Sequence, residues 1–188
     1  MAHRVCPWWL GYWLACPLRR WGQDPYKILA PYVREGMTVL EPGPGMGFFT
    51  LDLVRLVGAS GRVVAVDIQP KAIERLKRRA AEARLLHVID ARLTSPDLTG
   101  VDDLRGSVDF TLAFAVVHEL PDARRFFAEV AAASKPGASI LLAEPKGHVK
   151  TSEFDSELQA AADKGFKIVD RPSIRRAHAA LLRKTLSN

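Results

Sequence analysis

The sequence predicts an α/β domain built on a largely parallel sheet with helices on both faces. From about residue 36, short β-branched apolar runs alternate with helical stretches, which is typical of a parallel sheet that is covered on both sides. Residues 166–170 and 176–184 flank the short connection Arg171-Pro172-Ser173, which favours an antiparallel hairpin at the end of the sheet. With 188 residues, of which 48% are apolar, the chain has the size of one compact domain.

Each expected element has its own local signal. Asp24-Pro25 combines a helix cap with a first-turn proline, so a helix is expected from there to about residue 34, ending at Gly36. Apolar runs predict strands at residues 37–41, 62–67, 85–90, 107–117 and 139–144. Helical periodicity predicts helices at residues 46–57, 70–83, from 121 to a stop at 135–137, and 152–164. The 107–117 run is long and apolar, which indicates a central strand.

The first 35 residues form a segment of a different kind. All four Trp and all three Tyr lie within residues 1–32. Two prolines and three indoles make a poor secretion signal, so we expect an aromatic helical segment at 1–35, followed by the domain at 36–188. Aromatic side chains suit a surface with one wet and one apolar side. We therefore expect Trp8, Trp9 and Trp13 to cover a ligand cleft or to form an interface, such as that of a homodimer; a helix packed on the domain edge is the alternative.

Composition narrows the setting and the partners. Two cysteines, Cys6 and Cys16, are too few for a disulfide scaffold, which favours a reducing cytoplasm. No apolar run reaches the ~18–20 residues that cross a bilayer, so no membrane span is expected. The formal net charge is +6, but the basic residues at 70–83 read as the solvated face of a helix. No nucleic-acid partner is therefore expected.

A glycine-rich motif, Glu41-Pro-Gly43-Pro-Gly45-Met-Gly47, lies between the first strand of the domain and the helix that follows it. Glycines allow a backbone to approach a ligand closely, and the helix start presents unpaired N–H groups. Asp67 ends the next strand, where a carboxylate can accept hydrogen bonds from a ribose diol. Because Glu41 would repel a pyrophosphate, the pattern favours a ligand with a ribose, an adenine and a positive centre. A simple tight turn and a helix cap at Asp67 remain the structural alternatives.

Over about residues 36–185 the sequence resembles the class I S-adenosylmethionine-dependent methyltransferases, in particular the ubiquinone-type and arsenite-type enzymes. The resemblance implies S-adenosyl-L-methionine as cofactor and a Rossmann-like seven-stranded sheet of order 3-2-1-4-5-7-6, with the last strand antiparallel. It implies that the glycine loop wraps the methionine part of the cofactor, that Asp67 holds the ribose hydroxyls, and that Lys135-Pro-Gly forms the turn before strand five. It further implies that Asp90, with Ala91, contacts the adenine amino group and that Phe114 passes the amino-acid end of the cofactor. The residues that it assigns to the cofactor are Glu41, Gly43, Gly45, Gly47, Asp67, Ile68, Asp90, Ala91 and Phe114.

Candidate acceptor-site residues follow two strands of the predicted sheet. His118 and Glu119 come directly after the 107–117 run, at the edge where open α/β sheets bind ligands. His118 is the expected catalytic base, with Glu119 beside it, because an imidazole can take the acceptor's proton near neutral pH. Glu144 and His148 follow residues 139–143 and are expected to contact the substrate. These four side chains match no standard metal-binding spacing, so no metal is predicted; a purely turn-forming role for His118 and Glu119 is the alternative.

These observations predict a methyltransferase that acts on a small-molecule acceptor. A nucleic-acid or protein methyltransferase is one alternative. Base-amino methyltransferases carry a polar-proline-proline-aromatic motif after strand four, whereas this chain has Ala113-Phe114-Ala115-Val116. A non-catalytic S-adenosylmethionine-binding interaction module is another alternative. A nicotinamide-dependent oxidoreductase is disfavoured by Glu41 and by the final hairpin.

Overall fold

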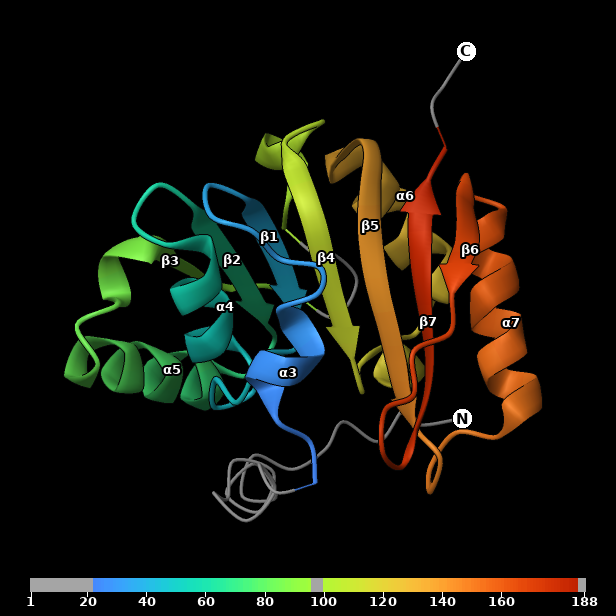
Figure 1. Ribbon diagram of the computed structural model, residues 1–188, viewed down its shortest axis with the longest axis horizontal. Coiled ribbons are helices and arrows are strands. Elements are labelled where there is room, and N and C mark those ends of the chain that lie inside the picture. The colour runs from blue at the N-terminus through green and yellow to red at the C-terminus, as the bar shows by residue number, and fades with distance from the viewer. Residues whose placement is uncertain (1–21, 96–99, 186–188) are drawn as a thin grey trace.

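The computed structural model describes residues 22–95 and 100–185 of the chain (Figure 1). Trp8, Trp9, Trp13 and both cysteines lie outside the described residues. The elements carry the labels of Figure 1. In chain order they are α3 (Pro25–Leu29), β1 (Thr38–Pro42), α4 (Thr50–Val57), β2 (Arg62–Asp67), α5 (Pro70–Glu82), the 3-10 turn η1 (Leu86–Val88), β3 (Ile89–Leu93), η2 (Asp102–Leu104), β4 (Val108–Phe114), η3 (Val117–Glu119), α6 (Ala123–Ala133), β5 (Ser134–Pro145), α7 (Thr151–Ala162), β6 (Phe166–Asp170) and β7 (Ala177–Lys184).

The described strands form one seven-stranded sheet of order β3-β2-β1-β4-β5-β7-β6. Strands β1 to β5 pair in parallel, whereas β7 runs antiparallel to both of its neighbours, β5 and β6. The predicted fold class, strand order and final antiparallel hairpin are confirmed. The central strands β1 and β4 are almost wholly buried, as their apolar sequences require.

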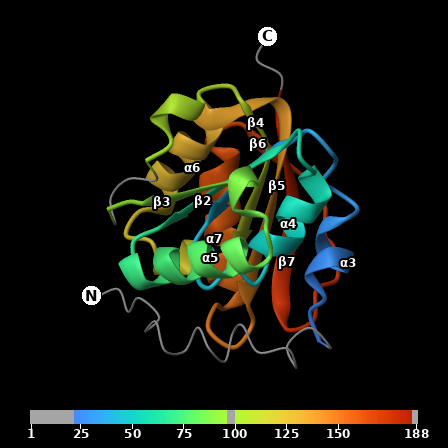
Figure 2. The same cartoon turned by 90° about the vertical axis from the view of Figure 1, so that its left-hand side faces the viewer.

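Helices cover both faces of the sheet. Figure 2 shows α3 and α4 on one side of the sheet and α6 on the other. One buried cluster includes Leu29 of α3 and Leu53 of α4, packed with residues of the central strands. A second cluster lies on the opposite face and includes Phe127 of α6 and Leu158 of α7. The sheet therefore has a separate apolar layer on each side.

Several predicted boundaries are wrong, and backbone conformation explains most of them. The strand expected at 85–90 begins only at Ile89, because Arg84 adopts a left-handed φ of 58° after α5 and residues 86–88 then form a 3-10 turn. The helix expected from residue 46 begins at Thr50, since the positive φ of Gly47 keeps the preceding chain in turns. The strand expected at 107–117 ends at Phe114, where Ala115 has a φ of 55°.

Three other elements differ in length from their prediction. The first described helix stops at Leu29; residues 30–32 form a turn and residues 33–34 are irregular, although the helix was predicted to run to residue 34. The expected turn at residues 135–137 is part of β5, which begins at Ser134. The last helix, α7, ends at Ala162 rather than at residue 164.

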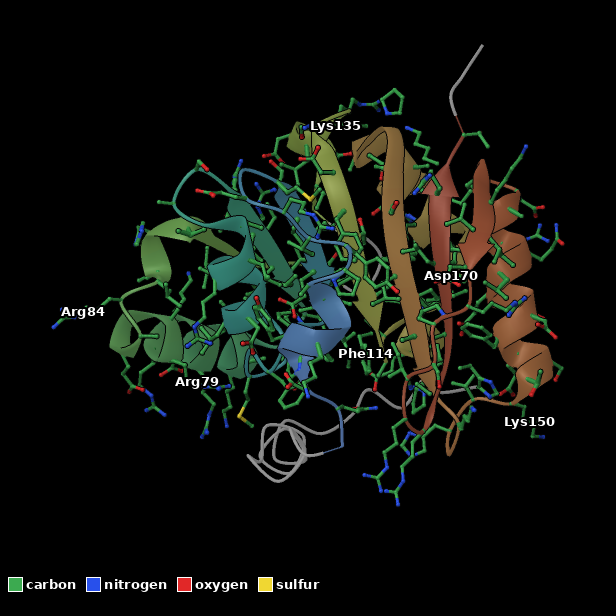
Figure 3. The ribbon with its side chains drawn as sticks, viewed as in Figure 1. Arg79, Arg84, Phe114, Lys135, Lys150 and Asp170 are labelled. Atoms are coloured by element: carbon green, nitrogen blue, oxygen red, sulfur yellow. The ribbon has the colours of Figure 1, made fainter. Side chains whose placement is uncertain are left out.

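The carboxyl ends of the parallel strands meet at one edge of the sheet. In Figure 1 the arrowheads of β1, β2 and β4 all point toward the lower edge. Figure 3 places Phe114, the last residue of β4, near this edge and Lys135, near the start of β5, at the opposite one. Loops at the carboxyl edge are where open α/β sheets bind ligands, so this edge carries the candidate site.

No helix within residues 22–95 and 100–185 has the length and apolar character that crossing a membrane requires.

Candidate active site

The glycine loop after β1 folds back against β2 and α5. The N–H of Gly43 donates to the carbonyl of Val66 over 2.8 Å, and the N–H of Gly45 donates to Oδ2 of Asp67 over 3.3 Å. Gly43 and Gly47 have φ values of 66° and 77°, in the left-handed region. A Cβ at Gly43 would lie 2.9 Å from Cγ2 of Val116, and one at Gly47 would lie 2.6 Å from Cδ1 of Leu76. Both positions therefore require glycine for conformation and for space.

Glu41 lies beneath this loop and is almost completely buried. Its Oε2 atom has no hydrogen-bond partner among the described residues. Burial raises the pKa of Glu41 to about 8; the nearby Thr50 hydroxyl opposes this shift, and the charge of Asp67 adds to it. A buried carboxylate without a partner is costly, so this position is suited to a ligand that brings a positive charge.

Asp67 is the second buried acid at this edge. Burial raises its pKa, while hydrogen bonds from the backbone of Gln69, Gly45 and Ile68 oppose that rise. The N–H of Gln69 donates to Oδ1 over 2.9 Å, so the side chain is held in one orientation. Each carboxylate oxygen can accept more than one hydrogen bond, which leaves capacity for a diol. Ile68 follows directly and is half-buried.

The structure places Asp90 away from these two acids. Asp90 pairs with Val64, whereas Leu93, at the end of β3, pairs with Asp67. The prediction that Asp90 ends its strand is therefore wrong, because the strand starts four residues later than expected. Ala91 shares this position inside the strand and pairs with Ala65.

The Asp90 carboxylate is engaged by two arginines. Nη2 of Arg92 donates to Oδ2 of Asp90 over 2.7 Å, and Arg62 pairs with the same oxygen. The hydrogen bond from Arg92 is the main reason that the pKa of Asp90 lies below its usual value. Arg92 also binds Asp103 over 2.6 Å, so the group links β2 and β3 to η2.

Thr94 and Ser95 directly follow the end of β3, at the edge where Asp90 was expected. The N–H of Thr94 donates to the carbonyl of Asp67 over 2.9 Å, so the backbone at Thr94 lies beside that of Asp67. Sequence reasoning missed these two residues because the strand was set too early. Two hydroxyl side chains next to each other after an apolar run were the signal in the sequence that could have placed them at this edge.

An aromatic group lies at the end of β4. The rings of Phe114 and Phe49 have centroids 4.4 Å apart, and Phe48 meets Phe49 edge-on at 5.0 Å. The sequence assigned Phe48 and Phe49 to a helix interior, whereas both precede α4 and lie in the turn that follows Gly47. Phe114, which the resemblance assigned to the cofactor's amino-acid end, thus contacts the end of the glycine loop.

Glu144 organises the loop that follows β4. Its side chain, on β5, is completely buried. Its Oε1 accepts hydrogen bonds from the N–H groups of Val116, over 3.3 Å, and Val117, over 2.8 Å. Its Oε2 lies 2.5 Å from Nδ1 of His118. Because a carboxylate can only accept, Nδ1 of His118 carries the hydrogen and Nε2 is the nitrogen left for other contacts.

The structure brings all four predicted acceptor-site residues together. Nε2 of His118 lies 4.0 Å from Oε1 of Glu119, and the ring centroids of His118 and His148 are 6.4 Å apart. Burial disfavours a charged His118, but the hydrogen bond and charge of Glu144, helped by Glu119 and Glu157, outweigh it and raise the pKa of His118. The imidazole is therefore a stronger base than a free histidine.

Within residues 22–95 and 100–185, no group of three or more His, Cys, Asp and Glu side chains is arranged to hold a metal ion.

The arrangement described above defines a class of protein: a seven-stranded mixed sheet with a glycine loop after β1 and an acid that ends β2. Residues 39–137, more than half of the chain, match the model of the methyltransferase domain family. The chain belongs to this family. Its fold is that of the class I S-adenosylmethionine-dependent methyltransferases: a SAM-dependent methyltransferase from Aquifex aeolicus superposes with a TM-score of 0.83, covering 95% of this chain and 98% of that chain at 22% identity.

Related proteins differ in the acceptors that their names state. The demethylmenaquinone methyltransferase of Halalkalibacterium halodurans is 26% identical over 67% of this chain and 49% of its own length. The arsenite methyltransferase of Halobacterium salinarum is 28% identical over 73% of this chain and 33% of its own length. A probable ribosomal RNA small subunit methyltransferase A of Methanopyrus kandleri is 29% identical over 55% of this chain and 40% of its own length. The chain thus spans half or less of these relatives, and the acceptor class is not determined by them.

S-adenosylmethionine is the cofactor of this class, and the residues present fit it. A geranyl diphosphate C-methyltransferase from Streptomyces coelicolor, solved with S-adenosyl-L-homocysteine, superposes with a TM-score of 0.69 over 87% of this chain and 79% of that chain at 15% identity. S-adenosylmethionine carries a ribose diol and a positive sulfonium and ammonium. Asp67 retains acceptor capacity for the diol, and the buried, unpartnered Oε2 of Glu41 suits a positive group. Gly43, Gly45 and Gly47 have no Cβ that would keep the backbone at these positions away from a ligand.

Cofactor affinity should depend on pH through Glu41. Because the pKa of Glu41 is about 8 without a ligand, a positively charged cofactor must bind the ionised form and displace a proton at lower pH. We expect the affinity for S-adenosylmethionine, measured by calorimetry, to rise about 25-fold between pH 6 and 7.5. Glu41→Gln should bind weakly and with little pH dependence, whereas Glu35→Gln, on the exposed surface, should behave as the wild type. An unchanged slope in Glu41→Gln would contradict the assignment.

Asp90 has two candidate roles, and one variant distinguishes between them. If Asp90 serves mainly to hold Arg62 and Arg92, Asp90→Asn lowers the unfolding temperature by a few degrees and leaves the S-adenosylmethionine Kd within about threefold. If Asp90 contacts adenine, the Kd rises about tenfold or more. Because both arginines already engage its carboxylate, we expect the first result. Thermal unfolding and calorimetry on the same sample decide between them.

Proposed function

We propose that the protein is an S-adenosylmethionine-dependent methyltransferase that acts on a small molecule through an acceptor atom that carries a proton. The observation that carries this proposal is the 2.5 Å contact between His118 and the buried Glu144, at the carboxyl edge that also bears the glycine loop. Glu41, Gly43, Gly45, Gly47, Asp67 and Ile68 are proposed to hold the cofactor, with Phe114 beside its amino-acid end. The placement of Asp90 and Ala91 at the adenine stays a prediction.

His118 is proposed to be the general base. When bound, S-adenosylmethionine supplies an electrophilic methyl group whose bond to sulfur breaks with the electron pair remaining on sulfur. As the acceptor atom bonds to that carbon, Nε2 of His118 takes the acceptor's proton. Glu144 then faces an imidazolium across its short hydrogen bond and stabilises it. Glu144 is buried, so in this proposal it acts through His118 rather than by contact with the acceptor, whereas Glu119 and His148 lie beside His118 toward the surface.

The proposed function is tested by finding which class of cellular molecule receives the methyl group. The full chain would be incubated with methyl-labelled S-adenosylmethionine and separated small-molecule, RNA and protein fractions of a cell extract. We expect label in the small-molecule fraction, and a loss of about a hundredfold in rate for His118→Gln because the base is removed. His87→Gln is the matched control, because His87 lies in η1, on another element of the fold.

The outcomes of this experiment are distinct. Label in RNA or protein would instead support the acceptors of the ribosomal RNA or other macromolecular methyltransferases among the relatives. Cofactor binding without transfer to any fraction would favour a non-catalytic binding module. A His118→Gln variant with wild-type turnover would remove His118 from the chemistry.

The aromatic segment is proposed to cover the acceptor. Trp8, Trp9 and Trp13 lie outside the described residues, but the point at which the segment joins the domain is described. Nε2 of Gln23 donates to the carbonyl of Arg175 over 2.8 Å. Arg175 precedes β7, whose first residue, Ala177, pairs with Pro145 at the carboxyl end of β5. The segment therefore joins the domain near the edge that carries His118.

Removing residues 1–21 should separate transfer from cofactor binding. We expect the truncated protein to lose turnover, because water would reach the methyl group and the acceptor would lose its cover, while the S-adenosylmethionine Kd stays within about twofold. The mass of both proteins in solution, measured by light scattering, reports whether the segment also forms the proposed homodimer. Normal turnover after truncation would refute the covering role.

A cytoplasmic location, favoured by the two cysteines, stays part of the proposal.

A further inference from the structure

Glu157 is a buried acid that the proposed function leaves without a role. It lies on α7, between Phe154 and Leu158, which pack into the apolar cluster on that face of the sheet. Glu157 exposes only 7% of its surface. Its Oε2 is buried and has no hydrogen-bond partner among the described residues. An apolar residue would fill this place at lower cost, so the carboxyl group requires an explanation.

Glu157 shares the buried face of α7 with Phe154, whose ring stacks on that of His178 with centroids 5.5 Å apart. His178 pairs with Glu144 across β7 and β5, so this face of α7 packs against the strands that carry the Glu144–His118 pair. Burial and the charge of Glu144 raise the pKa of Glu157 to about 8, while the charge of His118 opposes the rise and that of Glu153 adds slightly to it. The influence is mutual, since Glu157 contributes to the raised pKa of His118. The remaining titratable groups around His118 are Glu119 on η3, His148 in the loop after β5, and His178 on β7, opposite Glu144.

The contacts decide which of the two buried carboxyl groups carries the negative charge. Glu144 accepts hydrogen bonds from two backbone N–H groups and from His118, which together stabilise a carboxylate. Glu157 has no such donors at its buried oxygen. Two carboxyl groups that share a buried site do not both ionise readily, so the proton resides on Glu157 at neutral pH.

We propose that Glu157 is a positioning residue that tunes the basicity of His118: it is a carboxyl group buried beside the Glu144–His118 pair, and its negative charge, when present, strengthens the hold of the pair on the His118 proton. The proposal rests on the proposed function only in assigning His118 the role of base. Its physical content is a coupled titration of three side chains, which exists whether or not methyl transfer occurs.

The direct test follows His118 by NMR in the full chain with labelled histidine, using His118→Asn to assign its signal among the five histidines. In the wild type we expect a broad titration, because ionisation of Glu157 raises the affinity of His118 for its proton. Glu157→Gln mimics the neutral acid at every pH. We therefore expect a single-step titration of His118 with a pKa about one unit lower. Asp155→Asn removes an exposed carboxylate from the same helix and should leave the titration unchanged.

The stability of Glu157→Gln as a function of pH shows whether this variant folds as the wild type does. An acid whose pKa is raised by folding binds its proton more tightly in the folded state, so stability falls as pH rises from about 4.5 toward 8. Glu157→Gln lacks this loss. Its unfolding temperature should match that of the wild type near pH 4 and exceed it at pH 8.5.

A pH profile of turnover gives the second readout. At saturating S-adenosylmethionine, the acidic limb of the kcat/KM profile for the acceptor should move about one unit lower in Glu157→Gln, and the plateau should fall a fewfold because His118 is a weaker base. The Kd for S-adenosylmethionine should not change. A His118 titration identical in Glu157→Gln and wild type would overturn the proposal. Absence of methyl transfer in the wild type would overturn only the proposed function, because the NMR titration needs no turnover.

Discussion

The buried carboxylate of Glu144 is the interaction on which the acceptor side of the molecule depends. It reaches from β5 to the chain that leaves β4 and satisfies the N–H groups of Val116 and Val117 there. Ala115 turns into this loop with a φ of 55°, a conformation that costs a non-glycine residue roughly 1 kcal/mol. Hydrogen bonds from the backbone N–H groups to a buried carboxylate offset that cost. The same side chain orients His118, so the loop and the imidazole are held by one group.

The proposed cofactor side also depends on buried carboxyl groups, but there the hydrogen bonds of one of them are not satisfied within the described residues. Glu41 and Asp67 are both buried beneath a loop whose glycines bring the backbone close to them. Asp67 receives backbone hydrogen bonds, whereas Oε2 of Glu41 has no partner within the described residues. An unpartnered buried acid lowers the stability of the protein alone and is compensated only when a positive group arrives. In the proposed cofactor site, affinity for a cationic ligand is thus obtained at the expense of stability.

Sequence patterns predicted the sheet well because each signal was local or close to local. Alternating apolar runs and helices indicated the parallel strands, and the short link at 171–173 indicated the hairpin of β6 and β7. Boundaries were wrong where a non-glycine residue takes a left-handed conformation, as Arg84 and Ala115 do, since neither residue type announces it. The late start of β3 then moved Asp90 away from the carboxyl edge and left Thr94 and Ser95 in its place.

The sequence by itself determined the class of fold, the glycine loop and the acids at the ends of β1 and β2, because these depend on residue type at fixed spacing along neighbouring strands. It also placed His118, Glu119, Glu144 and His148 at one edge. Only the tertiary structure decided which of them is buried and which is a donor or an acceptor. Glu157 had no signal at all, since its position on α7 brings it to His118 only through packing across the sheet. Burial and long-range charge are properties of the packed chain, and no local pattern reports them.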